Sequence, residues 1–222
     1  MALNKLKFSS INVTPIANQA IKFNSSANGF ETGSAGGAMT FIKKITASSD
    51  STISFVHGSS SVVFDSTYKE YIFIFKNIHP ASDGAAFRFQ VSTNTGSSYG
   101  VAITSTNARY YHNESGSDNA LGSSTNFDLA NSTNFQALTD NAGSDTDHSC
   151  NGILHVFNPS STTFVKHFIS SFASSHSSDY SYNNLVSGYV NTTSAVDAIR
   201  FDFNDDNPVN IDSGTITLYG IN

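Results

Sequence analysis

The sequence is poor in charged residues, in cysteine and in strong helix formers. Charged side chains make up 13% of its 222 residues, about half of the usual share in a soluble protein. A single cysteine, Cys150, excludes an intrachain disulfide, so we expect folding in a reducing cytoplasm. Leu, Met, Glu, Lys and Arg are all scarce, which excludes a helical protein and a coiled coil.

Long apolar runs and clustered cations are also missing. The longest apolar run, Tyr71 to Phe75, is far shorter than the roughly 18 residues of a membrane-spanning helix. We therefore expect no membrane insertion, and the amino-terminal residues lack the apolar centre of a secretory signal. The net charge is −6, and the densest basic cluster is the pair Lys43–Lys44. Nucleic-acid binding needs several cations on one face, so we expect no such partner.

The residues that are abundant favour β-structure. Ser, Thr and Asn supply more than a third of the chain, and Ile, Val, Phe and Tyr occur in short segments between Ser, Asn, Gly and Asp turns. No amphipathic helix is long enough for a crossover connection, which excludes a parallel βαβ architecture. The sequence predicts an all-β, antiparallel two-sheet sandwich of jelly-roll type. The expected strands are Met39–Thr46, Ser51–Val56, Lys69–Ile78, Ala85–Ser92, Tyr99–Thr106, Gly152–Phe157, Thr163–Ser171, Leu185–Asn191, Ala198–Phe203 and Thr215–Ile221.

The pattern within some segments predicts their place in the sheets. Residues 69–78 are apolar on both faces, which is typical of a central, covered strand. Residues 85–92 alternate, with Phe87, Phe89 and Val91 expected to point inward. The turn residues 93–98 predict a hairpin between this strand and 99–106. Residues 107–150 are expected to be irregular, with a short helical turn within 126–138.

The first 38 residues differ from the remainder. Their few large apolar residues show no sustained alternation, and the Gly-rich run at 34–38 is typical of a flexible joint. We expect residues 1–38 to form an extended leader for attachment or oligomerisation, and residues 39–222 to form the β-sandwich domain.

One serine lies in a motif associated with catalysis. Residues 96–100 match the G-x-S-x-G pattern of a nucleophile elbow, with Ser98 at its centre. That motif requires a turn between a strand and a helix, whereas strands are expected on both sides here. We interpret Ser98 as part of a hairpin tip.

Several polar clusters contain the residue types of metal sites or of acid–base sites. Zinc sites pair two ligands with a second, distant pair, which the cluster around residues 145–150 lacks. The acidic run 202–207 has Asn207 and Ser213 where a calcium loop has Gly and a carboxylate, so it predicts a turn, with calcium as the alternative. We expect no enzyme, and no catalytic, cofactor-binding or metal-binding residue. The residues considered were Asp145, Asp147, His148, Cys150, His155 and His167 for zinc, Asp202, Asp205 and Asp206 for calcium, and Glu31, Glu70 and Glu114 for paired carboxylates.

Tyrosines gather in two places, Tyr110-Tyr111-His112 and Tyr180-Ser181-Tyr182. Both are expected in or beside polar loops. Exposed tyrosines there can form a protein interface or stack on sugar rings. The absence of Trp argues against sugar stacking and favours an interface or ordinary packing within the loops.

Several blocks of the chain resemble the small β-sandwich virion proteins of marine tailed bacteriophages. The leader at 11–37 is similar to their attachment leader, and the block at 152–163, GILHVFNPSSTT, is the most specific match. Further matching blocks lie at 65–71, 78–81, 165–167, 188–189, 191–199 and 213–221.

The resemblance implies a structural virion protein without catalytic residues. The expected function is a tail-fibre or appendage protein, docked on other virion proteins through residues 1–38 and displaying the sandwich for host-surface adhesion. Capsid decoration, as a head-fibre protein, and a carbohydrate-binding, lectin-like module are the alternatives. Expected partners are further copies of the chain in a homotrimer and host cell-surface glycans, and the expected location is the virion, after folding in the host cytoplasm.

Overall fold

The computed structural model describes residues 13, 14, 16, 19–33, 38–125, 127–205 and 207–221. The chain divides into two compact units, Met1–Thr40 and Phe41–Asn222. In the first unit, β1 (Ala20–Phe23) and β2 (Phe30–Gly33) pair as an antiparallel hairpin. Strands therefore occur within the segment expected to be an extended leader.

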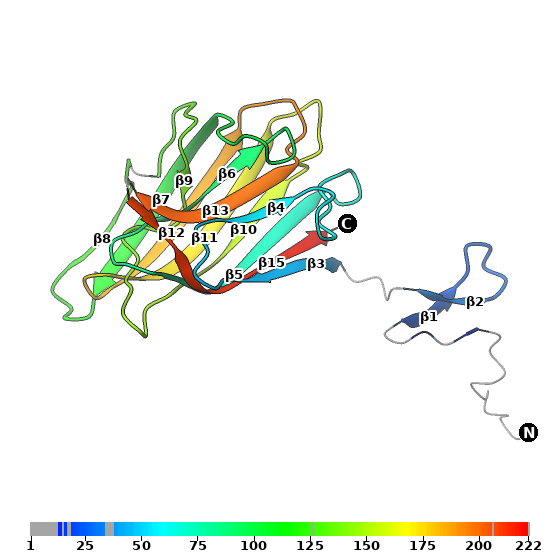
Figure 1. Cartoon of the computed structure of the whole chain (residues 1–222), viewed down its shortest axis with the longest axis horizontal. Helices are drawn as coiled ribbons and strands as arrows, with labels where there is room; N and C mark the ends of the chain where they lie inside the picture. The colour runs from blue at the N-terminus through cyan, green and yellow to red at the C-terminus, as the bar shows by residue number, and fades with distance from the viewer. Residues whose placement is uncertain are drawn as a thin grey trace, which may run out of the picture. The chain divides into compact units, whose positions relative to one another are not determined.

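The second unit is built from two antiparallel sheets that face each other (Figure 1). No described segment forms a helix of the length and hydropathy needed to span a lipid bilayer. The large sheet has the order β3 (Met39–Thr46), β15 (Ile211–Ile221), β5 (Glu70–Pro80), β10 (Cys150–Phe157), β11 (Lys166–His176), β12 (Tyr180–Val190), β7 (Ile103–Asn113) and β8 (Asn119–Gly122). The small sheet has the order β14 (Asn207–Val209), β13 (Ala198–Asp205), β6 (Phe87–Ser92) and β9 (Gln136–Ala137), with β4 (Ile53–Val56) also paired to β13.

The strand order is that of a jelly roll, as the sequence predicts. The chain passes from one sheet to the other through β3, β4, β5 and β6, and again through β9, β10, β13 and β15. These eight strands make two four-stranded sheets, β3-β15-β5-β10 and β4-β13-β6-β9. The strands β11, β12, β7 and β8 continue the large sheet beyond β10. We call these four strands the extension.

Phenylalanine fills the space between the sheets. The central strand β5 directs Phe73 and Phe75 inward, where Phe75 lies 5.1 Å from Phe201 of β13 and 5.0 Å from Phe172 of β11 between ring centroids. The inward positions predicted for β6 are confirmed: Phe87, Phe89 and Val91 are buried. The core is drawn from residues 42–218, within the second unit.

The inner face of the extension is covered by the segment 123–142. The side chain of Asn107 on β7 donates a hydrogen bond to the carbonyl of Ser124, and Arg109 on the same strand pairs with Asp140. Tyr111 and Tyr182 stack beside this pair with centroids 4.9 Å apart. Beneath this part of β7, polar and aromatic side chains thus line the inner face, whereas Phe168 and Phe172 of β11 belong to the phenylalanine core.

Two expectations for the middle of the chain are wrong. β6 and the strand that follows it, β7, lie in different sheets, so the hairpin expected between 85–92 and 99–106 does not form. Turn residues predict that the chain changes direction, but they do not predict whether the next strand joins the same sheet or the other one. Residues 107–113, which the sequence predicts to be irregular, belong to β7. Their inward Asn107 and Arg109 are polar, so the segment shows no apolar alternation.

The helical turn expected within 126–138 is also absent from the described residues. Asn126 itself lies outside them, and residues 127–138 contain β9 in place of a helical turn. β9 pairs with β6, with Gln136 opposite Phe89. Gln136 is fully buried and donates to the carbonyl of Phe127, which fixes this segment in an extended form.

Candidate functional site

The side of the large sheet that faces away from the small sheet carries the candidate site. Alternate residues of a strand share one face, and the pattern of exposure assigns that face on β10, β11, β12 and β7. We call these residues the outer face. They are Asn151, Ile153, His155, Phe157, His167, Ile169, Ser171, Ala173, Ser175, Ser181, Asn183, Leu185, Ser187, Tyr189, Thr104, Thr106, Ala108, Tyr110 and His112.

Three hollows follow the outer face from one end of the strands to the other. Their volumes are about 520, 560 and 410 Å³. The second and third share Thr106, Ile169 and Ser187. The first includes Ala173, and the second begins at Ser171, the next outward position of β11. Together they form one track, which we call the outer groove.

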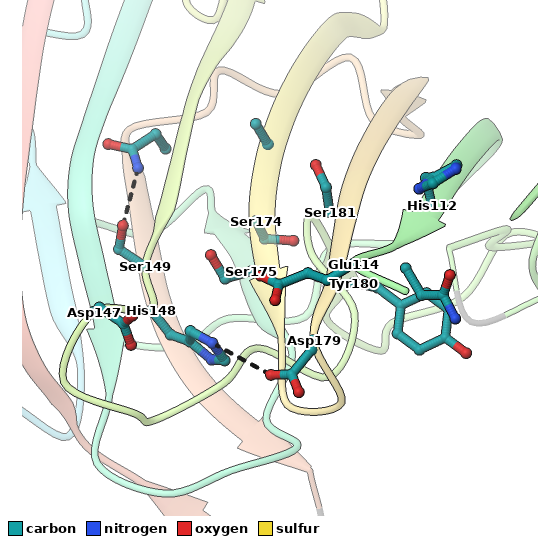
Figure 2. A pocket seen from close by; sticks show the side chains of 13 residues that line it. His112, Glu114, Asp147, His148, Ser149, Ser174, Ser175, Asp179, Tyr180 and Ser181 are labelled. Atoms are coloured by element: carbon teal, nitrogen blue, oxygen red, sulfur yellow. Dashed lines mark hydrogen bonds and ion pairs between the residues drawn. The ribbon is translucent and has the colours of Figure 1, made fainter. Parts of the chain in front are cut away.

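The first hollow is the polar end of the outer groove (Figure 2). Strand pairing places Ser175 opposite Ser181, and Ser181 opposite His112. Beyond the strand ends, the backbone N–H of Glu114 donates to the carbonyl of Asp179 at 3.0 Å. Three strands and the turn between β11 and β12 therefore converge on this hollow.

A second side of the polar end comes from the loop before β10. In Figure 2 the imidazole of His148 points toward the carboxylate of Asp179, with 3.9 Å between Nε2 and Oδ1. Tyr180 also lines this hollow and donates its hydroxyl to Asp118 at 3.1 Å. This hydrogen bond raises the pKa of Tyr180. The hollow thus presents carboxylates, imidazoles, hydroxyls and amides, which suit a ligand rich in hydroxyl groups.

The middle of the outer groove is apolar. Ile153 and Leu185 lie on either side of Ser171 in adjacent strands, and Ile169 is one outward position further along β11. The three aliphatic side chains are 39, 42 and 52% exposed. At the far end, the ring of His167 lies 5.8 Å from that of Tyr189.

The G-x-S-x-G segment lies elsewhere, in the connection between β6 and β7. Ser98 accepts a hydrogen bond from the side chain of Asn94 at 2.8 Å, and its N–H donates to Asn94 at 3.0 Å. Asn94 therefore organises this loop. The chain continues into β7 and not into a helix, so the geometry of a nucleophile elbow is missing.

The residues considered for zinc point in different directions. Cys150 faces the core and is fully buried, and burial raises the pKa of its thiol to about 12. His148 lies on the loop side, near Asp179. His155 and His167 share the outer face on neighbouring strands, but His155 is hydrogen-bonded to Glu70. No group of three metal-ligating side chains converges among the described residues.

Within the acidic run 202–207, β13 pairs antiparallel with β14, with Asp205 opposite Asn207. Asp202 is buried and pairs with Arg88 at 3.1 Å. Burial raises the pKa of Asp202, and the hydrogen bond from Arg88 opposes that change. The calcium alternative involved Asp206 and the side chain of Asp205, which lie outside what the structure describes.

Two glutamates considered for catalysis have basic partners. Glu70 bonds to His155, and Glu31 of the first unit pairs with Lys22 at 3.2 Å. Glu114 lines the polar end of the outer groove. Among the described residues of that hollow, no serine is hydrogen-bonded to a histidine.

The tyrosine clusters lie at the ends of two strands, β7 and β12, beside the turns that adjoin them. Tyr111 of β7 is paired with Tyr182 of β12, and both point inward. Tyr110 lies on the outer face and is 46% exposed. The clusters do mark the neighbourhood of the polar end. Sequence reasoning considered Glu114 but found no partner for it, and it missed Asp179, because only strand pairing brings the two residues together.

No family model, curated protein or solved structure matches the chain.

Proposed function

We propose that the chain is a non-catalytic structural protein of a bacteriophage particle. The amino-terminal unit docks on other virion proteins, and the jelly roll is displayed. The observation that carries this proposal is the apolar surface of the β1–β2 hairpin. Phe23 and Phe30 stack with centroids 4.9 Å apart, yet they remain 67 and 46% exposed.

A hairpin of this size needs further support. An isolated two-stranded hairpin is marginally stable in water, and Ile21 on β1 is also 39% exposed. Burial of each such side chain against a partner contributes roughly 1.5–3 kcal/mol, enough in sum to offset much of the cost of ordering the segment. The core of the jelly roll, by contrast, draws on residues 42–218. The hairpin therefore suits docking, and the jelly roll suits display.

The fold and the sequence blocks support the same assignment. Jelly rolls are common in viral structural proteins and in lectins, and the matching blocks described above resemble marine phage virion proteins. A homotrimeric tail fibre or appendage fits an attachment leader followed by a displayed domain. A capsid decoration protein also needs an attachment segment and a displayed domain, so it is the nearest alternative.

Removal of the leader tests the proposal. Deletion of residues 1–38 leaves β3 complete, so we expect a soluble, folded protein that is absent from purified particles. The double variant Phe23→Ser/Phe30→Ser should lose most of its incorporation as well. Phe164→Ser is the matched control, because Phe164 is also 67% exposed but lies in the second unit. Normal incorporation of the deletion variant would contradict docking through the leader.

Glycan binding is a second function that one observation favours, namely the polar end of the outer groove. Its hydroxyls, amides and carboxylates can accept and donate hydrogen bonds to sugar hydroxyls. Titration calorimetry with surface polysaccharide of the host should give measurable heat, which His112→Ala and Glu114→Gln should reduce at least tenfold in affinity. Identical affinity in these variants would place any glycan elsewhere.

A further inference from the structure

The outer face contains no Asp, Glu, Lys or Arg. Its positions all lie within the described chain, and they carry Ser, Thr, Asn, Ala, His, Tyr, Phe, Ile and Leu. The net charge of −6 is therefore carried elsewhere. Charged residues adjoin this face only at its margins: Glu70 and Lys76 at outward positions of β5, and Glu114, Asp147 and Asp179 around the polar end of the outer groove.

The centre of this uncharged area is hydrophobic. Ile153, Ile169 and Leu185 adjoin one another there and remain 39–52% exposed. A solvent-facing sheet normally carries polar side chains at such positions, and a polar rim around an apolar centre is typical of a protein interface. His112, Ser181 and Asn151 supply that rim at one end.

We propose that the outer face is the surface through which copies of this chain associate. The occupant is a second copy because two identical uncharged surfaces can meet without bringing like charges together. A partner carrying charge at the contact would lose hydration without gaining an opposite charge. Sugars would gain little from three aliphatic side chains, since they stack on aromatic rings.

The dimensions of the outer face fit such a contact. Four strands about 4.8 Å apart, each about nine residues long at roughly 3.4 Å per residue, cover on the order of 600 Å² before the relief of the side chains is added. A specific interface buries about 800 Å² on each partner. The hollows of about 560 and 410 Å³ give this face the relief into which side chains of another copy can insert.

Mass measurement of the full-length protein tests the association. Light scattering after size exclusion should give a multiple of the 23.7 kDa chain. The variants Ile169→Lys and Leu185→Lys should raise the dissociation constant on the order of 100-fold or more and yield monomers. Phe164→Lys is the matched control, because it also charges an exposed apolar residue but lies outside the outer face. It should leave the mass unchanged.

A second measurement reports on the outer face itself. The chain has no tryptophan, so Leu185→Trp introduces a single fluorophore there, and Phe164→Trp introduces one outside. The emission of the Leu185→Trp variant should shift to shorter wavelength as the protein concentration rises. The emission of the Phe164→Trp variant should not shift. A monomeric wild-type protein, or an oligomer that persists in both lysine variants, would overturn the proposal. A contact of this face with its own copy is isologous and closes a dimer, so it is independent of the threefold assembly in the proposed virion role. A monomer that still entered particles would overturn the association and leave the virion role intact.

Discussion

At the residue scale, Gly188 allows β12 to approach β7. A Cβ atom at this position would lie 2.4 Å from the carbonyl oxygen of Thr104 and 2.9 Å from the ring of Phe168. Because backbone would have to move, we expect Gly188→Ala to lower the free energy of unfolding by roughly 1–3 kcal/mol. Urea denaturation measures this loss. Gly122→Ala in β8 is the control, since no atom lies within 4 Å of its added methyl group. Equal losses in both variants would contradict the close approach.

His176 links stability to pH. Burial lowers the pKa of its imidazole from the ordinary 6.5, as does the nearby Arg109, whereas Asp140 opposes the change. A histidine with a lowered pKa is neutral in both states at high pH, and below about 6.5 the unfolded chain takes up the proton first. Stability should therefore fall as the pH drops from about 6.5 through the pKa of the folded state.

The variant His176→Asn isolates this contribution. Asn can still accept the hydrogen bond that the backbone N–H of Ser178 donates to His176, but it does not titrate. Thermal unfolding at several pH values should show a shallower loss of stability in acid for the variant than for the wild type. Parallel curves would show that His176 does not contribute to the pH dependence.

At the scale of the element, the extension depends on the segment that covers its inner face. Asp140 of that segment is buried and paired with Arg109 of β7. Removal of one partner leaves an uncompensated buried charge. We therefore expect Arg109→Ala to lower the free energy of unfolding by about 3 kcal/mol. The double variant Arg109→Met/Asp140→Leu removes both charges, so its free energy of unfolding should fall clearly less than that of Arg109→Ala. Chemical denaturation of the single and double variants measures the difference. A double variant as unstable as Arg109→Ala would argue against this explanation.

The elements differ in how far the sequence predicts them. Strands with alternating or continuous apolar residues, such as β3, β5 and β6, are evident from the pattern. The part of β7 after Thr106 is not, because its inward Asn107 and Arg109 bond to a distant segment that no local pattern reveals. The polar end of the outer groove was missed for a similar reason. Glu114 and Asp179 are far apart in the chain and meet only through the pairing of β7 with β12.

At the scale of the whole molecule, the two units should be separable. The jelly-roll core begins after residue 41, so deletion of residues 1–38 should change the free energy of unfolding by less than about 0.5 kcal/mol. Urea denaturation of both proteins, followed by far-ultraviolet circular dichroism, measures this. Both should show a strand spectrum with little helix. A marked loss of stability in the shorter protein would show that the leader contributes to the fold.

The position of β15 has a consequence for how the chain reaches its native state. β15 is the last described strand, yet it lies between β3 and β5 in the large sheet. Its pairing with β5 joins residues on opposite sides of more than a hundred intervening positions. Such distant pairings slow folding, and they cannot form on the ribosome until β15 has left the exit tunnel. Until then the backbone edges of β3 and β5 lack the partner that separates them, so the nascent chain should depend on chaperones more than a helical protein of the same length.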